Sequence, residues 1–150
     1  MTEESTAALS DQQIAHLGMI QGVINRMASN SFALKALAVT IAAAILAIAG
    51  AQQDAPASVS YVGLFPVVVF WLIDAKYLRL ERLFRSLYDH IREGRDFEAF
   101  SMNTTSFNKD VSSTLRIAVS WSVIWFYLAV AAALVAVSCL PIILEKEFRS

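Results

Sequence analysis

The stretch ALAVTIAAAILAIAGAQQ, residues 36–53, decides the fold class, because it carries no charge over 18 positions. Two further stretches are also free of charged residues: residues 55–73 span 19 positions and residues 117–144 span 28. About 20 predominantly apolar residues in a helix cross the hydrocarbon core of a bilayer. The sequence therefore predicts an all-α integral membrane protein. A soluble helical bundle is disfavoured, because its helices would keep a polar stripe.

The composition of the whole chain agrees with this prediction. Of its 150 residues, 57% are hydrophobic and 17% are charged, whereas soluble domains have roughly 45–50% and about 25%. The net charge of −1 gives no bulk attraction to nucleic acid. The one cysteine, Cys139, lies in the third apolar stretch, which excludes a disulfide framework.

We expect a single membrane domain, residues 1–150, that forms a helical bundle. Its expected segments are an N-terminal amphipathic helix (10–31), three transmembrane helices (32–51, 59–74 and 115–141) and a charged cytoplasmic helix and loop (75–114). The first helix should begin at a capping box formed by Ser10 and Gln13. Its apolar stripe is expected to pack against other protein rather than lie on the membrane surface. The stripe comprises Ile14, Leu17, Ile20, Ile24 and Met27.

Three residues are expected to shape the later helices. Pro66 should kink the second span, because proline removes a backbone donor. Gly94 should end the cytoplasmic helix, which continues directly from the second span. Pro141 should end the regular part of the third span.

The distribution of basic residues predicts the topology. The N-terminal segment has two, the turn at residues 51–58 has none, and residues 74–116 have eight. Because short cytoplasmic segments are enriched in Lys and Arg, the N-terminus and residues 74–116 should be cytoplasmic. The predicted location is the bacterial inner (plasma) membrane.

The sequence carries no recognisable catalytic or cofactor-binding motif. His16 and His90 have no metal-ligand spacing to another candidate residue, and neither GxxxxGK[ST] nor GxGxxG occurs. The three charge-free stretches, residues 36–53, 55–73 and 117–144, also offer no charge inside the membrane that would mark an ion path. We therefore expect neither an enzyme nor a metal site.

Four basic residues recur every third position on the cytoplasmic helix: Lys76, Arg79, Arg82 and Arg85. One interpretation is a binding surface for an anionic ligand such as a nucleotide or oligonucleotide, because the guanidinium group matches phosphate geometry. The other is positive-inside anchoring, with side chains that reach lipid headgroups. Arg82 and Arg85 are the better ligand candidates because they lie farther from the bilayer. Weaker candidates are Arg26, Arg92 and Arg95.

The first span has a face of small residues, formed by Ala36, Thr40, Ala43, Ala44 and Ala47. Small residues four positions apart let helix backbones approach closely in lipid. Three spans cannot enclose a water-filled route, so a pore would have to form between subunits. The sequence thus predicts a homo-oligomer, for which a tetramer is one arrangement.

Two segments resemble small membrane proteins of bacterial anti-phage defence loci. They are HLGMIQGVINRMASNSF, residues 16–32, and FPVVVFWLIDAKYLRLERLFR, residues 65–85. They are similar to the membrane effector of the Hailong system, whose partner is a nucleotidyltransferase that makes DNA oligomers. The resemblance implies a homo-oligomeric ion channel, gated by a single-stranded DNA oligomer, whose opening depolarises the infected cell and arrests growth.

Three functional hypotheses follow from the sequence. The first is an oligomeric channel effector controlled by a nucleic-acid or nucleotide signal. The second is a non-conducting membrane anchor that recruits a soluble partner through residues 74–116. The third is a component of a small transporter.

Overall fold

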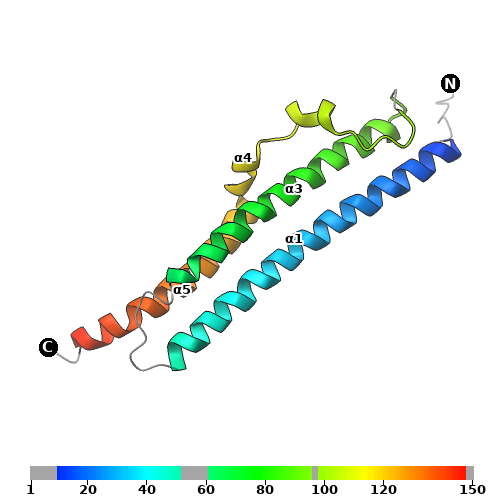
Figure 1. The fold of residues 1–150 in the computed structure, drawn as a ribbon. Coiled ribbons are helices and arrows are strands. Elements are labelled where there is room, and N and C mark those ends of the chain that lie inside the picture. Colours follow the sequence, from blue (N-terminus) through cyan, green and yellow to red (C-terminus); the bar gives the residue numbers. More distant parts are fainter. Residues whose placement is uncertain (1–9, 52–60, 96–97, 148–150) are drawn as a thin grey trace, which may run out of the picture.

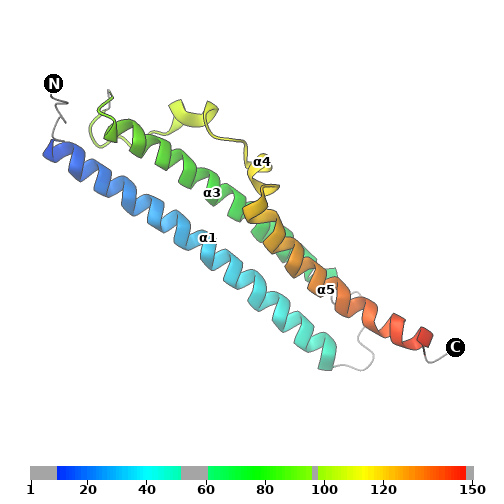
Figure 2. The same ribbon diagram turned by 180° about the vertical axis from the view of Figure 1, so that it is seen from behind.

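The structure is a computed structural model. It describes residues 10–51, 61–95 and 98–147, with side chains through residue 137. Over these residues the fold is all-α, with helices and loops and no strand. The helices are α1 (Asp11–Ala51), α3 (Leu64–Arg92), α4 (Thr114–Ala118) and α5 (Trp121–Glu147), with a short 3₁₀ helix, η1 (Thr105–Lys109). Figures 1 and 2 show α1 and α3 lying antiparallel along most of their length. The start of α1 and the end of α5 lie at opposite ends of this long bundle (Figure 1).

Helix α1 joins two segments that the sequence analysis separated. The amphipathic helix expected at 10–31 and the span expected at 32–51 form one continuous helix of 41 residues. No glycine or proline interrupts residues 23–49, so nothing breaks the backbone hydrogen-bond ladder. At 1.5 Å per residue, α1 is about 62 Å long, roughly twice the thickness of a bilayer core.

The expected capping box is confirmed at the start of α1. The Ser10 backbone N–H donates to Gln13 Oε1 at 2.8 Å, and the Gln13 N–H donates to Ser10 Oγ at 3.3 Å. The apolar stripe beyond it packs against the end of α3, as expected, where Leu17, Ile20 and Ile24 meet Leu87 and Ile91. Of the other two stripe residues, Ile14 is exposed and Met27 is half-buried outside this cluster.

Helix α3 runs through the second predicted span and the cytoplasmic helix without interruption. It begins at Leu64, so the first part of the predicted span, residues 59–60, lies outside the described residues. Pro66 falls in the first turn of α3, where the backbone N–H groups have no partner within the helix. Residues 61 and 62 are also helical and Gly63 forms a turn before α3, so the helical pattern is interrupted one turn before Pro66, which has no N–H to donate to the residue four positions earlier. The expected interruption by Pro66 is therefore met, although near the start of the span rather than in its middle. The expected stop at Gly94 is confirmed by its φ of +71°.

The third predicted span is divided. Helix α4 ends at Ala118, and α5 begins three residues later at Trp121. Side chains satisfy the carbonyl groups that the break exposes: Trp71 Nε1 donates to the Ala118 carbonyl at 2.9 Å, and Ser120 Oγ donates to the Ile117 carbonyl at 2.6 Å. At the other end, α5 continues to Glu147, so the expectation that Pro141 ends the helix is wrong.

The expectation of three membrane spans is met in part. By length and composition, α1 is the one helix among the described residues that is long and apolar enough to cross a membrane. A second apolar stretch, Trp121–Val137, is shorter. The second predicted span occupies only the first part of α3, whose remainder carries many charged residues.

Candidate functional site

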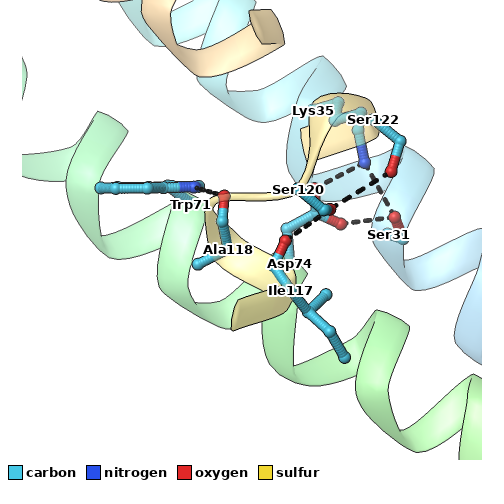
Figure 3. Close-up of polar contacts among 8 residues, drawn as sticks. All are labelled: Ser31, Lys35, Trp71, Asp74, Ile117, Ala118, Ser120 and Ser122. Atoms are coloured by element: carbon cyan, nitrogen blue, oxygen red, sulfur yellow. Dashed lines mark hydrogen bonds and ion pairs between the residues drawn. The ribbon is translucent and has the colours of Figure 1, made fainter. Parts of the chain in front are cut away.

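A carboxylate and an ammonium group form an ion pair at the centre of the bundle. Asp74, on α3, is completely buried, and Lys35, on α1, has a side chain that is 26% exposed. Lys35 Nζ donates to Asp74 Oδ2 at 2.5 Å. Ser31 Oγ donates to the other carboxylate oxygen and accepts from Lys35 Nζ at 2.9 Å, as Figure 3 shows. Both oxygens of the buried carboxylate therefore have a donor from α1.

Helix geometry explains why these groups meet. Ser31 and Lys35 are four residues apart and so lie on the same face of α1. Asp74 is followed at once by Ala75, which is also completely buried, so α3 presents this turn to its neighbours. A buried ion pair repays its desolvation cost only when the remaining hydrogen bonds are made. The Ser31 hydroxyl makes the remaining hydrogen bond, to the carboxylate oxygen of Asp74 that does not accept from Lys35.

A third helix contributes a polar group to the same region. Tyr127, on α5, is 3% exposed, and its hydroxyl completes no hydrogen bond. This hydroxyl lies close enough to the Asp74 carboxylate to interact with it electrostatically. Tyr127 also lines a hollow of about 160 Å³ between α3 and α5 together with Trp71, one turn before Asp74. Ser31, Lys35, Asp74 and Tyr127 are called the polar cluster below.

Sequence reasoning did not identify the polar cluster. In the sequence, Asp74 directly follows the second charge-free stretch, and no charge inside the three stretches indicates an ion path. The signal was nevertheless present: Lys35 precedes the first apolar stretch and Asp74 follows the second, so a helical hairpin brings the two opposite charges to the same level. Only the rotation of each helix about its axis decides whether they face each other.

The four basic residues predicted on α3 fall into different environments. Lys76 is exposed and Arg82 is half-buried, and neither forms an ion pair with any described residue. Arg79 donates through Nη2 to Asn108 Oδ1 at 3.0 Å and through Nε to the Ser112 carbonyl at 3.3 Å. Arg85 pairs with Glu81 at 2.6 Å. The Arg79 contacts hold the segment that carries η1 against α3.

The three weaker candidates lie outside the polar cluster. Arg92 pairs with Asp89 at 3.3 Å, and Arg95 pairs with Glu93. Arg26 is exposed on α1 and has no ion-pair partner among the residues that the structure describes. The structure therefore does not bring these arginines together with the four basic residues into one compact site.

A shallow hollow does form around one of the predicted ligand residues. Arg85 and Tyr88 of α3 line it with Gln21 and Ile24 of α1, over a volume of about 260 Å³. Asp89 completes the lining and brings a negative charge. The hollow thus offers a guanidinium group and an aromatic ring side by side, which are groups that contact phosphates and bases in single-stranded nucleic acid.

The predicted small-residue face of α1 is uncovered. Each of its five members is exposed in this chain: Ala36, Thr40, Ala43, Ala44 and Ala47. The residues that pack against α3 and α5 lie on another side of α1 and include Ala38 and Ala42, which are buried. The small-residue face therefore points away from the other helices of its own chain.

A second polar hollow lies at the end of the bundle near the N-terminus of α1. It has a volume of about 290 Å³, and both histidines line it together with Glu98, Ser101 and Phe107. His16 is buried, and its Nε2 lies 3.0 Å from the Ser101 carbonyl. Within the described parts of the chain, no group of three or more His, Cys, Asp or Glu residues could hold a metal ion.

Comparisons with protein-family models, with curated proteins and with solved structures find no match for this chain. Its function is therefore inferred from its own residues.

Proposed function

We propose that this protein is a homo-oligomeric ion channel effector of bacterial anti-phage defence, controlled by a polyanionic signal in the cytoplasm. In this proposal the apolar parts of α1, α3 and α5 are the three spans in the inner membrane, with the N-terminus inside. Opening of the pore depolarises the membrane and arrests growth. The signal is a single-stranded DNA oligomer or a nucleotide, which a nucleotidyltransferase encoded by a neighbouring gene would supply.

The observation that carries the proposal is the uncovered small-residue face of α1. All five of its residues are exposed, although they lie in the most apolar part of the longest helix. Alanine gains little from contact with lipid, whereas small side chains let two helix backbones approach closely. A second copy of the chain is therefore the partner that this face favours. A ring of copies would place α1 around a shared axis, where an apolar constriction can gate by dewetting.

The control site rests on the other half of α3. Arg82 and Arg85 lie two and three turns beyond Asp74, and Tyr88 adds an aromatic ring to the hollow beside Arg85. Repetition around a ring would turn these pairs into a basic collar below the pore. Such a collar can neutralise the phosphates of an oligonucleotide that crosses several subunits.

The anchor hypothesis also has an observation in its favour. Arg79 fixes the segment around η1 to α3 through Asn108 and Ser112, so this segment presents a folded surface rather than a loose loop. A soluble partner could dock there without any conduction. The two hypotheses differ in a single measurable quantity, the ionic current.

We expect the purified protein to conduct ions in planar bilayers and a short single-stranded oligodeoxynucleotide to change the open fraction. The double variant Arg82→Glu/Arg85→Glu should abolish this response and leave membrane insertion intact. Oligonucleotide affinity of the unaltered protein should fall with salt, with a log–log slope of about −0.7 for each phosphate contacted.

The matched comparison is Arg92→Glu/Arg95→Glu, which makes the same change of charge at the end of α3. It should retain most of the response, because neither of these arginines lines the hollow formed by Arg85 and Tyr88. Absence of current under every ligand condition would overturn the channel proposal and leave the anchor. Unchanged oligonucleotide binding by Arg82→Glu/Arg85→Glu would mean that these two arginines form a solvated face beneath the membrane.

A further inference from the structure

Asp74 carries a charge that needs a partner in any conformation of the bundle. Its carboxylate is completely buried, and both of its donors, Ser31 and Lys35, come from α1. If α1 moves relative to α3, the carboxylate loses both donors at once. An ionised carboxylate without a partner in such surroundings costs several kcal/mol. Any stable alternative conformation must therefore give Asp74 a new donor.

One described residue is placed to be that donor. Tyr127 is buried, its hydroxyl has no hydrogen-bond partner, and it comes from α5 rather than α1. It packs in the same core as Ala38, three residues after Lys35, and as Val67, seven residues before Asp74. A buried hydroxyl without a partner is rare, because an unsatisfied polar group away from water destabilises the fold. This cost would disappear if the hydroxyl donated to Asp74.

The surroundings leave room for this exchange. The hollow beside Tyr127 has a volume of about 160 Å³ and is lined by Val67, Trp71 and Leu128 among others. Lys35 is the only member of the ion pair with an exposed fraction, 26%, so its ammonium group can move toward solvent when it leaves Asp74. The carboxylate has no such route and must stay at the helix interface.

The polar cluster lies between the apolar half of the bundle and the half that carries the basic residues of α3. Lys35 lies 16 residues before the end of α1, or about 24 Å along the helix, so in the proposed topology it sits near the inner boundary of a ~30 Å core. The proposed ligand residues Arg82 and Arg85 are on the same uninterrupted helix as Asp74. A movement of α3 against α1 caused by a ligand would act on the ion pair directly.

We infer that Asp74 is a switch carboxylate that exchanges donors between two states of the protein. In the resting state it pairs with Lys35 and Ser31 and holds α1 against α3. In the active state α1 separates, Lys35 turns toward water, and the Tyr127 hydroxyl donates to Asp74 and so ties α3 to α5. This inference rests on the proposed function for the meaning of the two states, as closed and open. The exchange itself does not require conduction.

The test compares Lys35→Met, Tyr127→Phe and the double variant in planar bilayers. Lys35→Met removes the resting partner and should raise the open fraction without ligand by about 5- to 150-fold, the usual range of coupling between sites. Tyr127→Phe should change the resting open fraction much less than Lys35→Met does, because the hydroxyl, although near the Asp74 carboxylate, completes no hydrogen bond there. It should lower the open fraction reached with the oligodeoxynucleotide. The double variant should return toward the wild-type resting value.

Hydrogen exchange of the backbone amides in residues 28–38, measured in lipid nanodiscs, gives a second readout that needs no current. Lys35→Met should speed this exchange, and the oligodeoxynucleotide should do the same to the unaltered protein. If the unaltered protein carries no current under any condition, the proposed function fails, and these exchange rates alone decide the switch. Equal exchange in Lys35→Met and wild type would overturn it.

Control variants separate the switch from general damage. Lys109→Met and Tyr61→Phe make the same chemical changes at exposed positions and should leave both readouts unchanged. Lys35→Met/Asp74→Leu removes both buried charges and should fold well, because packed apolar groups can replace a buried ion pair. Addition of Tyr127→Phe to this double variant should change neither the open fraction nor the rate of hydrogen exchange. If Tyr127→Phe acts equally with and without Asp74, then Tyr127 does not serve the carboxylate, and the exchange is refuted.

Discussion

At the scale of single residues, the same type of side chain has different tasks on one helix. Arg79 and Arg82 are three positions apart on α3, yet Arg79 is bonded to Asn108 and to the Ser112 carbonyl, whereas Arg82 forms no ion pair with a described residue. Phosphate recognition needs a guanidinium group that is free to turn toward the ligand. Arg79 therefore fits a structural role better than the ligand role that its spacing indicates.

Replacement of Arg79 by Ala should loosen the segment around η1. Hydrogen bonds from a charged donor contribute about 1.5–3 kcal/mol each when well made, and partial exposure of Arg79 reduces this to about 1 kcal/mol overall. Hydrogen exchange in residues 105–113 should then be several-fold faster than in wild type. Lys76→Ala is the control, because Lys76 is exposed on the same helix. A loss of oligonucleotide binding with unchanged exchange would instead make Arg79 a ligand residue.

At the scale of helices, α1 presents two small-residue faces with opposite surroundings. Ala38 and Ala42 are buried against α3 and α5, whereas the face that contains Ala43 and Ala47 is uncovered. Neighbouring positions in the sequence point about 100° apart on a helix. Substitutions one residue apart can therefore separate packing within a chain from packing between chains.

Ala43→Leu and Ala47→Leu should each abolish the oligomer in mild detergent while the helical content of the chain stays normal. Added bulk on the uncovered face prevents close approach between copies and changes nothing inside the chain. Ala42→Leu is the matched variant: overpacking a buried position costs about 1–3 kcal/mol, so its thermal midpoint should fall. Native mass spectrometry and circular dichroism give the two readouts. Normal assembly of both outer variants would mean that this face contacts lipid.

At the scale of the whole molecule, the antiparallel pairing of α1 and α3 produces a bundle with one apolar end and one charged end. The basic part of α3 lies beside the first half of α1, and the ends of both helices that border residues 52–60 lie far from it (Figure 1). In the proposed topology the bilayer surrounds the apolar half, and the distribution of basic residues, two, none and eight, predicts that the other half is cytoplasmic.

This topology can be tested with single cysteines in a Cys139→Ser background. A cysteine at Gln53, which lies outside the described residues, should react with an impermeant thiol reagent in intact cells. A cysteine at Ser106, which is exposed on η1, should react only after the membrane is opened. Labelling of Ser106→Cys in intact cells would invert the arrangement.

The sequence by itself determined which segments are helical and where several of them begin and end. The capping box at Ser10 and Gln13 and the stop at Gly94 are signals carried by a few adjacent residues, and local backbone chemistry is enough to read them. Apolar periodicity also identified the stripe of α1 that packs against α3. The interruption near Pro66 is a local effect as well, because proline has no N–H to donate to the residue four positions earlier.

Only the tertiary structure decided which side chains meet. The pairing of Lys35 with Asp74 joins residues 39 positions apart, and it depends on the relative rotation and shift of two helices, which no local pattern encodes. The same holds for Arg79, whose partners lie beyond a turn, and for the division of the third apolar stretch, where Trp71 of another helix satisfies a freed carbonyl. Hydrophobic patterning determines where the helices form, whereas the effect of a buried charge depends on the partner that packing places beside it.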